Sequence, residues 1–158
     1  MPVTLREMTR RAAEAVAAGE RPGDARTADD HPTEFSVGVA QHVGRAGQFG
    51  PFFVHRAEDD VVIGEIGGAF VDEDGTIEIG YAIVGSHRNR GYATAAVEAL
   101  VALAREAPTV RRVVAHTPLD RPQSGRVLEK AGFTDLREVD DADEAGTVVR
   151  VKEWERLV

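Results

Sequence analysis

The stretch RNRGYAT, residues 88–94, decides how this chain folds. It follows a strand-like run in which side chains alternate between two faces, and it leads into an apolar stripe at helical spacing. A helix N-terminus exposes unpaired N–H groups and the positive end of the helix dipole. Gly91 lets the backbone approach a bound group, and Arg88 and Arg90 add positive charge. The stretch therefore predicts either a pyrophosphate cradle or a capped helix after a surface loop. It matches neither the P-loop pattern nor the dinucleotide fingerprint.

Flanking patterns predict the other elements. We expect helices from a capping box at Thr4 and Glu7 to Gly19, and again from near Thr33. Strands are predicted at residues 51–55, from residue 61, and at 76–84. The helix after Gly91 is followed by a strand at 112–115, a helix from Pro122 to Gly132, and strands at 133–139 and 147–152 around an acidic turn at 140–144. This order predicts an α/β fold with a mixed sheet and helices on both faces. The N-terminus looks too short for an opening strand, so we expect an open sheet edge that could pair with a second subunit as a homodimer.

Length, composition and charge set broad limits. The 158 residues suit a single domain, 1–158, and 27 acidic against 19 basic residues give a formal charge of −8. Nucleic-acid binding is not expected, because phosphate neutralisation needs a dominant basic surface. There is no apolar run of roughly 20 residues to span a membrane. Cysteine is absent, which excludes disulfides and thiolate sites and suits a cytoplasmic location.

Three elements in the right order resemble one family. The spacing Arg88-x-x-Gly91-x-Ala93 is similar to the Q/R-x-x-G-x-G/A signature of the GNAT N-acetyltransferase superfamily. Residues 124–133, SGRVLEKAGF, and residues 77–81, IEIGY, resemble a helix and a strand of the branch that includes ribosomal-protein N-terminal acetyltransferases. The resemblance covers roughly residues 61–135. It makes a nucleotide-binding domain unrelated to coenzyme A the less favoured alternative.

The resemblance implies a mostly antiparallel sheet in which two parallel strands splay apart, here near residues 83–85 and 112–117. Acetyl-CoA would bind in that gap as cosubstrate, and no metal is implied. Backbone groups of Ile83 and Gly85 would pair with the pantetheine arm, and the amides of residues 88–94 would hold the pyrophosphate. The implied cofactor-binding residues are Ile83, Val84, Gly85, Arg88, Asn89, Arg90, Gly91, Tyr92, Ala93, Thr94 and Arg121.

Such enzymes transfer an acetyl group to an amine, which a base must first deprotonate. Glu78 is the first candidate base, although it also fits an ordinary surface glutamate of a strand. Glu65 and His116 are weaker candidates. Ser124 is the candidate proton donor to the leaving thiolate, and its alternative role is a hydrogen bond to a backbone carbonyl one turn earlier.

Two departures from the family pattern leave a non-catalytic acyl-CoA-binding or regulatory module as the alternative. Leu128 stands where many relatives have a tyrosine, and Arg121 stands where an asparagine is usual. The expected acceptor is a primary amine, either a small molecule or a peptide N-terminus. Acidic residues near 30–34 and 140–144 would suit a cationic amine, but they would equally serve solubility.

Overall fold

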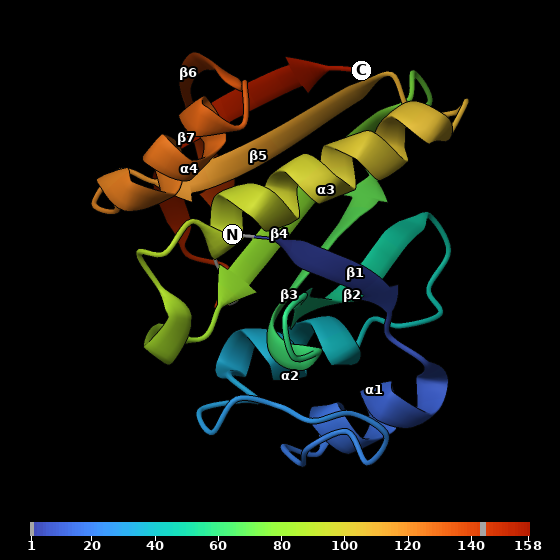
Figure 1. Cartoon of the computed structure of the whole chain (residues 1–158). Coiled ribbons are helices and arrows are strands. Elements are labelled where there is room, and N and C mark those ends of the chain that lie inside the picture. Colours follow the sequence, from blue (N-terminus) through green and yellow to red (C-terminus); the bar gives the residue numbers. More distant parts are fainter. Residues whose placement is uncertain (1, 143–144) are drawn as a thin grey trace.

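The computed structural model describes residues 2–142 and 145–158, in which seven strands form one sheet in the order β1-β2-β3-β4-β5-β7-β6 (Figure 1). The strands are β1 (Val3–Glu7), β2 (Gln48–Arg56), β3 (Val61–Phe70), β4 (Thr76–Ile83), β5 (Arg112–Pro118), β6 (Thr134–Ala142) and β7 (Val148–Leu157). The helices are α1 (Arg10–Ala17), α2 (Glu34–Ala40), α3 (Tyr92–Glu106) and α4 (Pro122–Lys130), with a 3-10 turn, η1 (Gly85–His87), between β4 and α3. The predicted α/β class with a mixed sheet is confirmed.

The two central strands separate along their length. β4 and β5 are parallel, and their ladder runs from Thr76 opposite Arg112 to Ile79 opposite Ala115. Beyond that point β4 stays paired with β3, and β5 stays paired with β7 as far as Pro118. The other neighbouring strands of this sheet are antiparallel. A gap therefore opens between the C-terminal halves of β4 and β5, as the resemblance implied.

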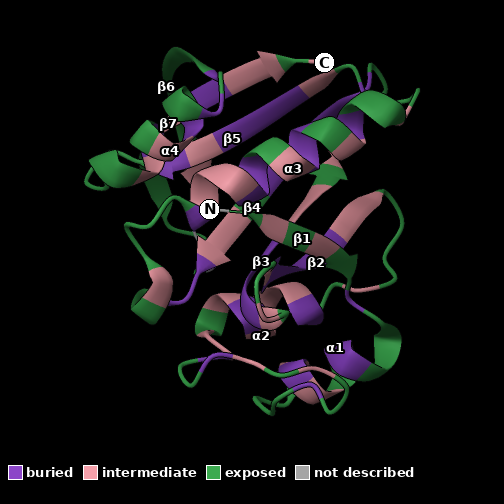
Figure 2. Ribbon diagram, in the orientation of Figure 1, coloured by how far each residue is buried: buried purple, intermediate pink, exposed green. Residues whose placement is uncertain are grey.

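The helices cover both faces of the sheet, as predicted. α3 and α4 pack on one face, where the larger core contains Ile77, Leu100 and Leu128. α1 and α2 cover the other face over part of the sheet, with Val16 and Phe53 in a second, smaller core. Figure 2 shows buried residues along the central strands and on the inward side of α3. The alternation of side chains on the strands divides the apolar residues between the two cores.

The N-terminal prediction was wrong in one respect. Residues 3–7 form strand β1, which pairs antiparallel with β2, and the first helix begins only at Arg10. The side chain of Thr9, not Thr4, caps this helix by accepting a hydrogen bond from the Ala12 amide at 3.1 Å. Leu5 lies three residues before Met8, which imitates a helical period, but Leu5 belongs to β1 and Met8 lies in the link between β1 and α1. The sheet therefore has its opening strand, and the reason given for a dimer is removed.

The other expected boundaries are close to the observed ones. Thr33 caps α2 in a capping box with Ser36, although α2 ends at Ala40, before Val43 of the predicted stripe. Pro122 begins α4, and Gly132 follows it with a φ of +85°, the left-handed conformation expected of a glycine after a helix. Of the predicted acidic turn, residues 140–142 belong to β6, and residues 143–144 lie outside the described residues. Among the helices of the described part, none is long and apolar enough to cross a membrane.

Candidate active site

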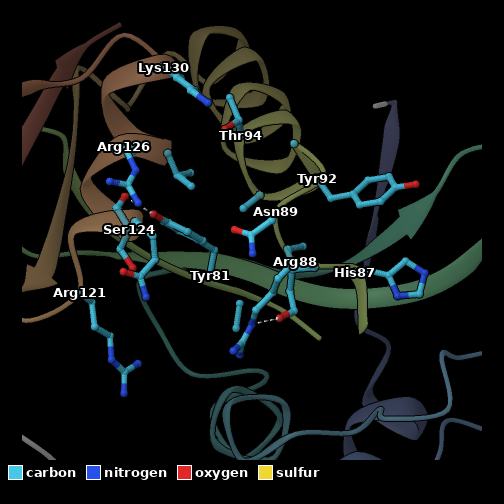
Figure 3. Close-up of a pocket in the computed structure, with 16 residues that line it drawn as sticks. Tyr81, His87, Arg88, Asn89, Tyr92, Thr94, Arg121, Ser124, Arg126 and Lys130 are labelled. Atoms are coloured by element: carbon cyan, nitrogen blue, oxygen red, sulfur yellow. Dashed lines mark hydrogen bonds between the residues drawn. The ribbon is translucent and has the colours of Figure 1, made fainter. Parts of the chain in front are cut away.

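A cleft of about 690 Å³ lies at the splayed ends of β4 and β5 (Figure 3). The end of β4, the turn after it, the first turn of α3 and most of α4 form its walls. Its lining includes nine of the predicted cofactor or catalytic residues: Ile83, Arg88, Asn89, Gly91, Tyr92, Ala93, Thr94, Arg121 and Ser124. The sequence motif therefore lies at this cleft.

The N-terminus of α3 opens toward this cleft. Gly91 is its N-cap residue in a left-handed conformation with a φ of +83°, and no side chain caps the helix. A methyl group added at Gly91 would meet no atom within 4 Å, so the space in front of the helix is open. The first amides of a helix have no partner within the helix, and they and the dipole favour a bound anion.

Four basic side chains share the cleft, although the chain as a whole is acidic. Arg88, Arg121, Arg126 and Lys130 all belong to the lining, and the last three come from α4 or the residue before it. They converge on one cavity with the α3 N-terminus. The cleft therefore suits a ligand with several phosphate groups, and the residues present fit coenzyme A.

Three predicted cofactor residues lie outside the lining. Val84 is buried and its amide donates to the Ile63 carbonyl at 2.8 Å, while Gly85 begins η1 and Arg90 is exposed. The Ile83 carbonyl, expected to pair with a pantetheine arm, accepts a hydrogen bond from Arg88 Nε at 3.1 Å. Arg88 thus occupies one of the two lone pairs of that carbonyl.

Asp30 fastens the turn at the mouth of the cleft. Its carboxylate accepts from the Ser86 amide at 2.8 Å and from the Ser86 hydroxyl at 2.7 Å. Burial opposes ionisation of Asp30, but these hydrogen bonds outweigh it and lower its pKa. His87 follows Ser86 in the same turn. Burial and the charges of Arg56 and Arg90 lower the pKa of His87, so this imidazole is neutral near pH 7. The loop before α2 thus holds the turn η1 in place through Asp30 and Ser86.

Tyr81 is a cleft residue whose role sequence reasoning missed. Its hydroxyl donates a hydrogen bond to the Ser124 backbone carbonyl at 3.1 Å, which links β4 to the first turn of α4. Burial raises the pKa of Tyr81 to about 12. Leu128, at the position of the missing family tyrosine, is completely buried in the core. Tyr81 shares one face of β4 with Ile77 and Ile79, so the sequence alone predicts only that it lies on an apolar face.

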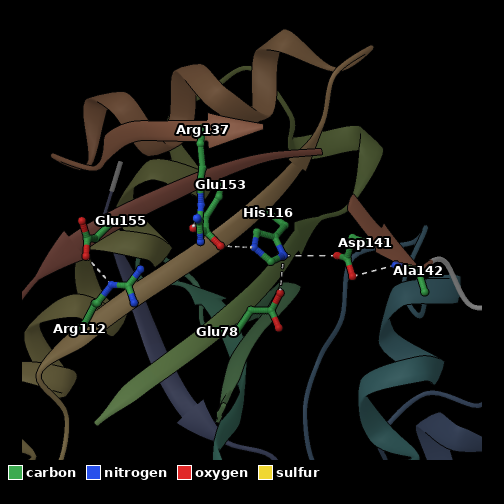
Figure 4. A network of polar contacts seen from close by, with 8 residues as sticks. All are labelled: Glu78, Arg112, His116, Arg137, Asp141, Ala142, Glu153 and Glu155. Atoms are coloured by element: carbon green, nitrogen blue, oxygen red, sulfur yellow. Dashed lines mark hydrogen bonds and ion pairs between the residues drawn. The ribbon is translucent and has the colours of Figure 1, made fainter. Parts of the chain in front are cut away.

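A cluster of charged side chains lies where β4 and β5 separate (Figure 4). Glu78 precedes the last paired residue of β4, and His116 follows the last paired residue of β5. His116 Nδ1 lies 2.7 Å from Glu78 Oε1 and 3.3 Å from Asp141 Oδ2. His116 Nε2 lies 2.9 Å from Glu153 Oε2. The structure thus brings together two candidate bases, Glu78 and His116, with Asp141 of the predicted acidic segment and with Glu153, which the sequence did not single out.

The cluster lies on the other face of β4 from Tyr81. Glu78 and Gly80 are two residues apart on β4, so they share one face of the strand. A methyl group added at Gly80 would lie 3.7 Å from the Phe35 ring of α2. This face therefore carries α2, whereas Tyr81 reaches α4 on the opposite face. Glu78 is absent from the lining of the cofactor-side cleft. The gap between the strands separates a basic cleft from an acidic cluster.

The ionisation of His116 couples stability to pH. Burial by itself would lower the pKa of His116, but hydrogen bonding to Glu153 and the charges of Glu78 and Asp141 outweigh it, so the pKa is raised above 6.5. The bond to His116 likewise lowers the pKa of Glu153 below 4.5. A raised histidine pKa stabilises the fold fully below 6.5, and this contribution is lost as pH rises through the folded pKa. The Glu153 contribution is present above 4.5 and is lost as pH falls through its lowered pKa.

His116→Gln is therefore expected to destabilise the protein more at about pH 5.5 than at about pH 9, where wild-type His116 is itself neutral. Urea unfolding midpoints at both pH values measure the difference. His42→Gln is the matched control, because His42 is exposed. Equal losses for His116→Gln at the two pH values would contradict the ion pairing.

Glu65, the weaker candidate base, has a different role. It is 1% exposed, and its two carboxylate oxygens bond to His31 Nε2 and, at 2.6 Å, to the Ser36 hydroxyl. Both partners are buried, and they belong to the loop before α2 and to α2 itself. Glu65 fastens this segment to β3 and is not a residue of the cleft lining.

Among the residues that the structure describes, one group of side chains could hold a cation. Single ligand atoms of Glu78, His116 and Asp141 lie within 4.8 Å of one another. Because His116 Nδ1 faces both carboxylates at hydrogen-bonding distance, a proton on this nitrogen already satisfies the arrangement. That the protein uses no metal stays a prediction.

Comparison with known proteins gives the family. A family profile described as "Acetyltransferase (GNAT) domain" matches residues 3–134. This chain belongs to the GNAT acetyltransferase family. A relative in sequence is the uncharacterized N-acetyltransferase YjdG of Bacillus subtilis (strain 168), which is 44% identical over 62 residues. That match covers 39% of this chain and 37% of YjdG, so the chain matches little more than a third of the length of YjdG.

Solved GNAT structures share the fold over nearly the whole chain. An acetyltransferase of the GNAT family from Bacillus anthracis has a TM-score of 0.72 at 19% identity, covering 99% of this chain and 95% of that one. The structure of AAC(6')-Ib with paromomycin and acetyl-CoA gives a TM-score of 0.72 at 19% identity, covering 99% of this chain and 94% of that one. Spermidine N-acetyltransferase from Vibrio cholerae with CoA and spermine gives 0.67 at 15% identity, covering 98% and 95%. At these identities the likeness establishes the GNAT fold.

Proposed function

We propose that this GNAT protein is an acetyl-CoA-dependent N-acetyltransferase that acetylates a primary amine. The observation that supports the proposal is that a basic cleft and an acidic cluster lie on the two faces of the gap between β4 and β5. The basic cleft with the open α3 N-terminus lies on one side of β4, and the Glu78–His116 cluster lies on the other. A phosphate-bearing acyl donor and a cationic acceptor would meet between them.

The cleft residues would hold coenzyme A by its phosphates. The amides at the start of α3 would bind the pyrophosphate, and Arg88, Arg121, Arg126 and Lys130 would neutralise the remaining charge. Acetyl-CoA supplies an activated acetyl group as a thioester. Arg121 replaces the usual asparagine, and its place in the cleft lining suits a contact with a phosphate rather than with the neutral pantetheine arm.

Glu78 would act as the base on the acceptor side. An amine reaches the enzyme as an ammonium ion and attacks only after losing a proton. Glu78 is half-buried and its Oε1 lies 2.7 Å from His116 Nδ1, so a carboxylate oxygen that could take this proton faces the gap between the strands. Asp141 and Glu153 hold the imidazole from two further directions. The negative charge of the cluster would also attract the ammonium group.

The acceptor itself is proposed only as a class. The motifs that resemble the ribosomal-protein branch support a peptide N-terminus. In contrast, two neighbours in fold are AAC(6')-Ib with bound paromomycin and a spermidine N-acetyltransferase with bound spermine. Both kinds of acceptor present a primary amine with positive charge. A cytoplasmic location and a homodimer stay predictions, and light scattering of the purified chain tests the dimer.

A thiol-release assay tests the proposal against the non-catalytic alternative. Purified protein with acetyl-CoA is offered polyamines, aminoglycosides and short peptides with free N-termini. Release of free thiol that depends on one class of amine supports the enzyme and identifies the acceptor class. Tight binding of CoA without turnover on any of these amines would favour the non-catalytic module.

A further inference from the structure

The reaction proposed above leaves a sulfur atom that needs a proton. Breaking the bond between the acetyl carbon and sulfur leaves an electron pair on sulfur, and a nearby proton donor accelerates that step. Leu128, at the helical position where a tyrosine was expected, is fully buried and has no proton to give. Ser124 has a hydroxyl, but an aliphatic hydroxyl is a much weaker acid than a phenol. The cleft therefore needs a better donor.

Tyr81 reaches the first turn of α4 from the neighbouring strand. It lies two residues beyond the last paired residue of β4 and two before Ile83, where the strands have already separated. Its hydroxyl is 3.1 Å from the Ser124 carbonyl, and Figure 3 shows the side chain extending across the cleft to this turn. The phenol thus lies beside the residue that sequence reasoning chose for the same task.

The surroundings of Tyr81 suit an acid. Because burial raises its pKa to about 12, the phenol keeps its proton throughout the physiological range. The basic side chains that line the cleft would stabilise a short-lived phenolate. The only other tyrosine of the chain, Tyr92, extends the other way and packs against His87 with ring centres 5.9 Å apart.

We propose that Tyr81, rather than Ser124, donates the proton to the leaving sulfur, and this proposal rests on the acetyltransferase function proposed above. The amine nitrogen forms a bond to the acetyl carbon as the carbon–sulfur bond breaks. Tyr81 gives its phenolic proton to sulfur and becomes a phenolate, while Glu78 takes a proton from the amine. Counted from its ammonium form, the amine loses two protons, one before the attack and one as the amide forms. One of them replaces the proton of Tyr81 through water and the other is released to solvent, so the products are the amide, free thiol and one proton.

Tyr81→Phe tests this assignment, because it removes only the hydroxyl. We expect kcat to fall about 10²-fold while the Kd for CoA changes less than about twofold, because a proton donor acts in the chemical step. Ser124→Ala tests the competing assignment and should lower kcat clearly less than Tyr81→Phe does. If Tyr81→Phe has normal kcat, or Ser124→Ala shows the larger loss, the assignment is wrong.

A fluorinated tyrosine placed at position 81 supplies a second readout. Ring fluorines lower the pKa of a phenol and add little bulk, so this variant keeps the hydroxyl if Tyr81→Phe fails to fold. If Tyr81 is the proton donor, kcat should begin to fall on the alkaline side at a lower pH in this variant than in the wild type, because the fluorinated phenol loses its proton at lower pH. An unchanged pH profile would overturn the proposal. If the wild type binds CoA and acetylates no amine, the proposed function fails instead, so the two failures are distinguishable.

Discussion

Glu78→Gln is expected to lower kcat by about 10³-fold at saturating acetyl-CoA, with little change in the Kd for CoA. Glutamine keeps the size of the side chain but cannot accept the proton of the ammonium group. Because Glu78 lies on the opposite face of β4 from the basic cleft, cofactor binding should survive the change. Steady-state kinetics on the best amine, together with calorimetric titration of CoA, measure the two effects separately.

The control for Glu78→Gln is Glu73→Gln, which removes the same charge from an exposed residue just before the same strand. The pH profile adds a second criterion. If Glu78 is the base, raising the pH should partly rescue Glu78→Gln, because more of the amine is then deprotonated in solution. Unchanged turnover of Glu78→Gln at every pH would remove Glu78 from the reaction and leave His116 as the remaining candidate in the cluster.

Gly64→Ala is expected to cost about 3 kcal/mol of folding free energy. A Cβ atom at Gly64 would lie 2.1 Å from the Ala82 carbonyl oxygen, a backbone atom that cannot move without displacing β4. Gly64 pairs with Ile83, so the displacement would reach the end of β4 that lines the cleft. Thermal or urea unfolding measures the loss, and weaker CoA binding should accompany it.

Gly38→Ala is the matched control for Gly64→Ala. Gly38 lies within α2, and a Cβ atom there meets nothing within 4 Å. Alanine favours the helix by up to about 1 kcal/mol over glycine, so this variant should be as stable as the wild type or more so. A Gly64→Ala protein with wild-type stability would show that β3 and β4 are not packed as closely as described.

Sequence reasoning located the cleft before α3 because the signals that mark it are local. Gly91, the basic residues around it and the apolar stripe that follows are contiguous, and together they position one helix N-terminus. β1 was missed because its five residues are few, and the spacing of Leu5 and Met8 imitates a helix. A short strand gains its stability from pairing with β2, which no local pattern reveals.

The acceptor side depends on long-range register. Glu153 faces His116 because β7 pairs with β5 in one particular register, and Asp141 reaches the same imidazole from β6. No spacing along the sequence predicts that Glu153 and Asp141 contact His116. Tyr81 belongs to the IEIGY motif, but its spacing of two residues from Ile79 and four from Ile77 predicts only a side chain on the apolar face of a strand. Its hydroxyl gains a role only where the strands separate and α4 begins.

Calorimetric titration with CoA is the most direct test of the central claim, that the cleft before α3 binds this cofactor. Three proteins suffice: the wild type, Gly91→Glu and Gly19→Glu. Gly91→Glu puts a negative charge in front of the α3 amides, whereas Gly19→Glu imposes the same positive-φ strain at the end of α1, in equally open space. We predict one site per chain in the wild type and in Gly19→Glu, and at least about 10²-fold weaker binding by Gly91→Glu. Equal affinity in all three proteins, or no binding by the wild type, would contradict the account.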